Sequence, residues 1–197
     1  MITSTIEICG DFADSGVKHG EYVTLVFSPQ SAPLRQRWRN NGLSADFLGD
    51  FVTTFFPGEE NAQGTVRKQA EIRSAVCYVA NELLENAMKF HERGVDFPVE
   101  INVVLNTDSV RLELVNATSP QRAEEYRQWV SKCAGGDSAE MLVACMEANA
   151  ASDVKVNSGL GLLTILNDYR AKFGWKFELL CEPEALTSVT TQVVLAL

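Results

Sequence analysis

This sequence has few histidines, and its cysteines are not closely spaced. Only His19 and His91 occur among 197 residues, which leaves little material for a histidine-based metal site or a catalytic triad. The cysteines are odd in number and widely separated, unlike the paired ligands of a zinc site. They are Cys9, Cys77, Cys133, Cys145 and Cys181. Such scattered residues indicate reduced thiols, as expected in the cytoplasm.

Long apolar runs and clusters of basic residues are also lacking. No segment approaches the roughly 20 apolar residues of a membrane span, and the first residues do not resemble a secretion signal. The 17 Lys and Arg are outnumbered by 26 Asp and Glu, giving a formal net charge of −9. Nucleic-acid phosphates are bound chiefly by clustered basic side chains. We therefore expect a cytoplasmic protein that binds neither nucleic acid nor a membrane.

The chain does have enough apolar residues, 46% of the total, to bury a substantial core. We predict a single domain over residues 1–197, with a loose strand and turn in residues 1–20. The apolar patterns predict strands at residues 22–27, 99–105, 110–115, 175–181 and 187–197. We expect two hairpins among them, one of 99–105 with 110–115 and one of 175–181 with 187–197. Helices are predicted at residues 33–56 with a break at 40–42, at 65–91, 120–132 and 139–151, and after residue 159. Loops are predicted at residues 57–64 and 152–158, and a turn around Pro183.

This order of elements predicts an α/β (α+β) fold. We expect a two-layer sandwich in which the helices cover one face of a mixed, mainly antiparallel sheet. In the first helix, Leu43, Phe47, Phe51 and Phe55 recur at near-helical spacing. This stripe is interpreted as core, and a surface for dimerisation is the alternative.

The segment VANELLENAMKF, residues 79–90, carries the most chemical information. Glu82, Asn86 and Lys89 are spaced by four and three residues, so they lie within about 60° of each other on a helix. A neighbouring stripe is apolar and suits a core: Ile72, Val76, Val79, Leu83, Ala87 and Phe90. An acid, an amide and an amine on one face fit a nucleotide site, because they can accept a proton, ligate a cation and contact phosphate. They fit a solvated helix face equally well.

A glycine segment precedes another helix further along the chain. Residues Gly159 to Leu162, reading GLGL, lead directly into an amphipathic helix. Glycines let the backbone approach a bulky anion closely, and the first turn of a helix offers unpaired N–H groups. The pattern is therefore compatible with phosphate binding, although glycines that only relieve packing would look the same.

Taken together, these motifs and their order resemble the GHKL (Bergerat-fold) ATPases over nearly the whole chain. Within that superfamily, the chain looks most like bacterial anti-sigma-factor-type serine/threonine kinases. The helical insert at residues 117–158, in the position of the ATP lid, is similar to that of the SiaB-like branch.

The resemblance implies a role for each matching residue. Glu82 matches the general base, Asn86 matches the asparagine that ligates Mg²⁺ at the ATP phosphates, and Lys89 matches a basic position nearby. The segment Gly159, Leu160, Gly161 and Leu162 matches the second glycine box, whose backbone amides hold phosphate. Thr191 falls where a sheet threonine often contacts the adenine side.

One position departs from the family pattern. Asn116 stands where an aspartate normally accepts a hydrogen bond from the adenine amino group, and the glycines that follow the aspartate are missing. The amide oxygen of an asparagine can still accept one hydrogen bond, but this bond is not charge-assisted as it is with a carboxylate. The exchange therefore predicts weaker ATP affinity or base selectivity.

Two functions follow from the resemblance. The first is a kinase that uses ATP and Mg²⁺ to phosphorylate a Ser or Thr of a small anti-anti-sigma (STAS) protein in partner switching. The second is a catalytically inactive binding module that keeps the fold and its interaction surface. A sigma factor is a further candidate partner, and a homodimer is a candidate assembly.

Overall fold

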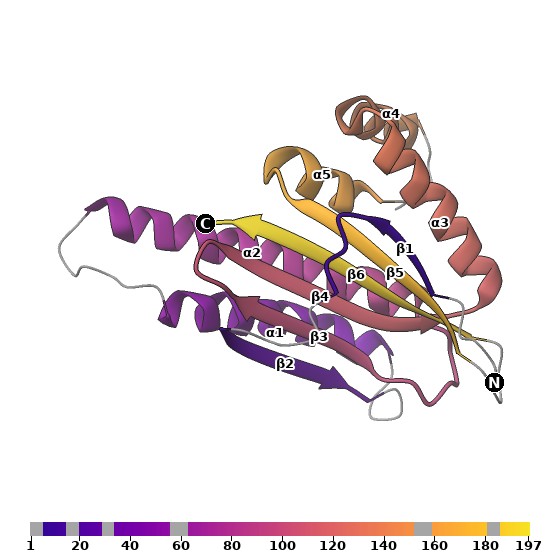
Figure 1. Cartoon of the computed structure of the whole chain (residues 1–197), viewed down its shortest axis with the longest axis horizontal. Coiled ribbons are helices and arrows are strands. Elements are labelled where there is room, and N and C mark those ends of the chain that lie inside the picture. Colours follow the sequence, from indigo (N-terminus) through magenta and orange to yellow (C-terminus); the bar gives the residue numbers. More distant parts are fainter. Residues whose placement is uncertain (1–5, 15–19, 29–33, 56–62, 152–158, 181–185) are drawn as a thin grey trace.

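The computed structural model describes residues 6–14, 20–28, 34–55, 63–151, 159–180 and 186–197. These residues form five helices and a six-stranded antiparallel sheet (Figure 1). The expected two-layer α+β arrangement is confirmed at this level. The expected mixed sheet is wrong, because every pairing between the described strands is antiparallel. The predicted loop at 57–64 is described only at its last two residues, which belong to the helix that begins at Gln63. The predicted loop at 152–158, the turn near Pro183, and residues 1–5 and 15–19 lie outside the described residues.

The sheet follows the strand order β1-β5-β6-β4-β3-β2. Its strands are β1 (Ile6–Gly10), β2 (Glu21–Phe27), β3 (Val99–Leu105), β4 (Ser109–Thr118), β5 (Lys172–Leu180) and β6 (Leu186–Ala196). Strands β3 and β4 pair directly, as do β5 and β6, so both predicted hairpin pairs are confirmed. The two pairs meet where β4 lies beside β6, at the centre of the sheet.

The helices are α1 (Leu34–Thr54), α2 (Gln63–Phe90), α3 (Pro120–Gly135), α4 (Ser138–Ala151) and α5 (Leu160–Asp168). The predicted break at residues 40–42 is wrong, because α1 continues through it. In the same helix Ala45, Leu48 and Val52 are buried in the core. Asn and Gly at residues 40–42 have unfavourable helix propensities. Burial of the apolar face stabilises the helix by more than these propensities destabilise it.

The stripe of apolar residues on α1 does not belong to the core as predicted. Leu43 and Phe47 are 70% and 50% exposed, and Phe55 is also exposed. Only Phe51 packs partly against the core, with its ring 5.0 Å from that of Phe55. The buried face of α1 is therefore made of smaller side chains, which allow close packing against α2.

The side chains of β4 point alternately to the two faces of the sheet. Val110, Leu112 and Leu114 are buried in the core with residues of α1 and α2. Arg111 and Glu113 lie on the opposite face, where their side chains form a 3.2 Å ion pair. The strand continues to Thr118, three residues past its predicted end, so Asn116 lies within the strand. Period-two alternation places Asn116 and Thr118 on the same face as Leu114.

None of the helices in the described segments combines the length and the apolar composition required to cross a membrane.

Candidate functional site

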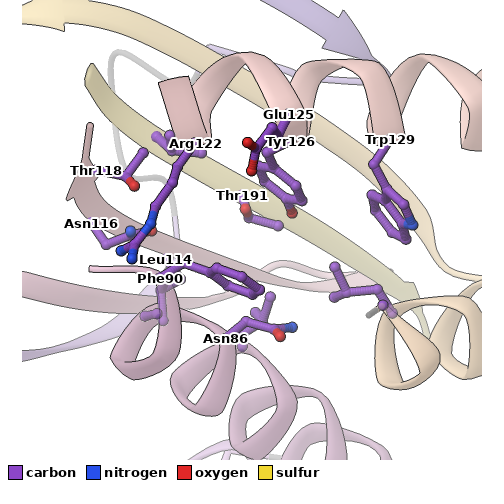
Figure 2. Close-up of a pocket in the computed structure, with 15 residues that line it drawn as sticks. Asn86, Phe90, Leu114, Asn116, Thr118, Arg122, Glu125, Tyr126, Trp129 and Thr191 are labelled. Atoms are coloured by element: carbon purple, nitrogen blue, oxygen red, sulfur yellow. The ribbon is translucent and has the colours of Figure 1, made fainter. Parts of the chain in front are cut away.

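A pocket of about 320 Å³ opens between α2, the sheet, α3 and the start of α5 (Figure 2). Its walls are mostly apolar, with a few polar groups. The lining residues are Leu83, Asn86, Ala87, Phe90, Leu114, Asn116, Thr118, Arg122, Glu125, Tyr126, Trp129, Gly159, Leu162, Val189 and Thr191. Five of the predicted site residues are among them, namely Asn86, Asn116, Gly159, Leu162 and Thr191. An apolar cavity with a few converging polar groups is the usual form of a small-molecule site.

Helix α2 supplies one wall through Leu83, Asn86, Ala87 and Phe90. Phe90 was predicted as core, but it is 42% exposed and lines the pocket instead. Lys89 does not line the pocket, since its side chain is exposed and its Nζ lies 5.1 Å from the centroid of the Phe90 ring. Of the predicted triad on α2, Asn86 alone lines the pocket.

The sheet supplies the opposite wall. Leu114, Asn116 and Thr118 of β4 line the pocket beside Val189 and Thr191 of β6. The register pairs Leu114 with Thr191 and Asn116 with Val189, so these side chains project together from one face. This pairing brings side by side residues that are 77 and 73 positions apart in the sequence.

The beginning of α5 closes one end of the pocket. Gly159 is the N-cap residue, with φ 81° and ψ 4°, a left-handed conformation that disfavours other residues. Its carbonyl oxygen accepts a 3.0 Å hydrogen bond from the N–H of Leu163, and no side chain caps the helix. The N–H groups of the first turn lack partners within the helix, which makes this end suited to an anion. Leu162 lines the pocket, whereas Leu160 and Gly161 do not.

Glu82 joins the two motifs although it does not line the pocket. A Cβ atom at Gly161 would overlap the Glu82 carboxylate, so that carboxylate lies directly against the first turn of α5. Burial raises the pKa of Glu82 above its ordinary value, and the negative charge of Glu85 adds to the increase. The helix face on α2 and the glycine segment are thus in contact, as the sequence interpretation required.

The raised pKa gives a test of this environment that does not depend on activity. A carboxyl group whose pKa is raised on folding destabilises the folded state once it is ionised. Glu82→Gln removes that penalty, so we expect the variant to melt at a higher temperature than the wild type at about pH 8. The difference should shrink as the pH falls through the raised pKa of Glu82 and should be lost below about pH 4, where the carboxyl group is protonated in both states. A difference in melting temperature that did not depend on pH would contradict the buried environment of Glu82.

Helix α3 adds four residues that sequence reasoning did not assign to the site: Arg122, Glu125, Tyr126 and Trp129. Their spacing of three and four residues, a signal present in the sequence, places them on one helical face. The rings of Tyr126 and Trp129 stack with centroids 5.8 Å apart. A Cβ at Gly159 would lie 2.5 Å from the indole of Trp129, so this ring covers the start of α5. The start of the predicted insert therefore forms a wall of the pocket.

The hydroxyl of Tyr126 is fixed within the core. It accepts a 2.9 Å hydrogen bond from the indole nitrogen of Trp175. Burial raises the pKa of Tyr126 to about 12, although hydrogen bonds with Thr191 and Trp175 oppose the increase. Tyr126 is thus a neutral structural group, and Thr191 both lines the pocket and helps to hold α3 on the sheet.

Carboxylates, cysteines and histidines are not gathered for metal binding in the described part of the chain. Asn86 offers an amide oxygen, which suits Mg²⁺ because this cation often uses one or two protein oxygens together with substrate phosphates and water. No protein-family model matches the chain, and no curated protein matches it either.

Proposed function

We propose that the protein is an ATP-dependent kinase with the Bergerat fold, related to the SiaB-like branch of bacterial anti-sigma-factor-type serine/threonine kinases. One observation carries the proposal. A single pocket is lined by Asn86 of α2, Asn116 of β4, Thr191 of β6 and Gly159 at the start of α5. Asn86 and Gly159 belong to the two sequence motifs that fit a nucleotide site, and Asn116 and Thr191 fall at positions that the family resemblance assigns to the adenine side.

In this proposal the triphosphate of ATP lies towards the first turn of α5. The N–H groups of that turn, which have no partner within the helix, and the positive end of the helix dipole favour negative charge. The amide oxygen of Asn86 ligates Mg²⁺, which when bound neutralises charge on the phosphates. The apolar side chains of Leu83, Ala87 and Leu162 surround the nucleotide and exclude water.

Glu82 acts as the general base in the proposed reaction. It takes the proton from a Ser or Thr hydroxyl of the partner while that oxygen attacks the γ-phosphorus and ADP leaves. A raised pKa suits this role, because a general base works best when its pKa is near the working pH. The phosphate would add about two negative charges to the partner's binding surface and so switch its affinity.

A catalytically inactive binding module is the second candidate, and two observations favour it. The carboxylate of Glu82 and the indole of Trp129 both lie against the start of α5, where a phosphate would bind. Lys89, which was expected near the phosphates, is not part of the pocket lining. In this alternative the fold acts only through contact with its partner.

Isothermal titration with ATP and Mg²⁺ tests the proposal directly. The wild type is expected to bind ATP, and Asn86→Ala is expected to lose magnesium-dependent binding because its only side-chain oxygen is removed. The matched control is Asn81→Ala on the same helix. Asn81 donates a 3.2 Å hydrogen bond to Glu85 and is not part of the pocket lining.

The control should bind ATP like the wild type, and circular dichroism should show that both variants are folded. A folded Asn86→Ala that binds ATP and Mg²⁺ normally would exclude the metal role. Transfer of labelled phosphate to a small STAS-type partner, captured from a cytoplasmic extract, would separate the kinase from the inactive module. The same capture would reveal a sigma factor as a further partner.

A further inference from the structure

We infer that the pocket accepts guanine as well as adenine nucleotides, because an amide at position 116 can pair with either base. This inference rests on the proposed function and specifies its substrate class. It depends on which end of the pocket holds the base and on the chemistry of the side chains there.

The two ends of the pocket differ in kind. Trp129 lies at one end, against Gly159 and the start of α5. Asn116, Thr118 and Arg122 lie together at the other end (Figure 2). A triphosphate directed at α5 leaves the base at the Asn116 end. The atoms of a purine farthest from its ribose are N1 and the substituent on C6, so this edge meets Asn116.

Asn116 is buried, at 7% exposed, and its side chain carries both a donor and an acceptor. With adenine, Oδ1 accepts from the 6-amino group while Nδ2 donates to N1. When the side-chain amide is rotated by about 180° so that its two atoms exchange places, Nδ2 donates to O6 of guanine and Oδ1 accepts from its N1–H. Each base makes two hydrogen bonds and leaves neither amide atom unpaired, so Asn116 does not discriminate between them.

Two neighbours support purine binding at this end. Thr118 is 4% exposed, and its hydroxyl lacks a hydrogen-bond partner among the described residues, although it lines the pocket. A hydroxyl both donates and accepts, so it also fits either base. The guanidinium of Arg122, which lies 4.0 Å from the carboxylate of Glu92, can only donate. It therefore adds a potential partner for O6 of guanine and none for the amino group of adenine.

Isothermal titration of the full chain with ATP, GTP and CTP, each with Mg²⁺, tests the inference. We expect the Kd values of ATP and GTP to agree within about tenfold, since Asn116 pairs equally well with both bases and the additional donor of Arg122 contributes about one hydrogen bond. CTP should bind at least about tenfold more weakly, because its smaller ring leaves the Asn116 end unfilled. A preference for ATP over GTP of about a hundredfold or more would overturn the inference.

Substitutions test which residues recognise the base. Asn116→Leu, of similar shape, should weaken ATP and GTP by about the same factor, roughly tenfold or more. Arg122→Met should weaken GTP more than ATP. The control Asn81→Leu, outside the pocket, should change neither. Unequal losses in Asn116→Leu would contradict the role of the amide. Failure of the wild type to bind any of the three nucleotides would instead reject the proposed function, and the inference with it.

Discussion

Glu82→Gln is expected to slow phosphoryl transfer to the partner by about a hundredfold or more while leaving ATP binding nearly intact. Glutamine keeps the size of the side chain, so it still fits against Gly161. It cannot take a proton from the attacking hydroxyl. Single-turnover transfer of labelled phosphate measures the rate, and titration with ATP measures binding in the same preparation.

The matched control for this variant is Glu85→Gln. Glu85 lies on the same helix outside the pocket lining, and its carboxylate accepts a hydrogen bond from Asn81. Its loss should lower the raised pKa of Glu82 slightly, because one negative neighbour is removed, and should leave the transfer rate close to that of the wild type. Unchanged transfer in Glu82→Gln would remove Glu82 from the mechanism and favour another base.

Gly159→Ala is expected to destabilise the fold by about 2–4 kcal/mol and to weaken nucleotide binding by about tenfold or more. Two costs combine at this position. Alanine disfavours the left-handed conformation at φ 81°, and its Cβ would come within 2.5 Å of Trp129. The strain lies at the start of α5, where the phosphates are proposed to bind. Thermal or urea unfolding and titration with ATP measure the two effects.

Gly42→Ala is the control, because a Cβ there meets no atom within 4 Å and α1 is regular at this point. It should be neutral or stabilise the protein by about 0.5–1 kcal/mol, since alanine is the better helix former. A second variant, Gly159→Ala combined with Trp129→Leu, relieves the overlap but keeps the backbone strain. Wild-type stability in Gly159→Ala alone would contradict both the left-handed N-cap and the close packing of Trp129.

The chemistry of single helices could be read from the sequence because it depends on local spacing. The offsets of four and three between Glu82, Asn86 and Lys89 are a property of any helix, and α2 does cover them. The outcome for the three differed, since Asn86 lines the pocket, Glu82 lies against Gly161, and Lys89 is exposed. Which part of a helical face meets a neighbour depends on how that helix is rotated against the sheet, and local spacing contains no such information.

The incorrect predictions for α1 and the omission of α3 from the site have the same origin. A stripe containing Leu43 and Phe47 has the composition of a core face, but Ala45, Leu48 and Val52 are buried instead. Asn40, Asn41 and Gly42 favour a break locally, yet burial of the neighbouring turns keeps α1 continuous. The aromatic residues of α3 were not assigned to the site because nothing in their own segment indicates that the pocket lies beside them.

By itself, the sequence determined the existence of the main helices and strands, the hairpin pairs, and the chemical types available for a site, because these depend on periodicity and on neighbours within a few residues. Only the tertiary structure decided that Asn86, Asn116, Thr191 and Gly159 line one pocket and that Trp129 covers its end. Those contacts join residues that are far apart in the chain. They are fixed by the antiparallel register of β4 with β6 and by the packing of α2, α3 and α5, which minimise exposed apolar area for the chain as a whole.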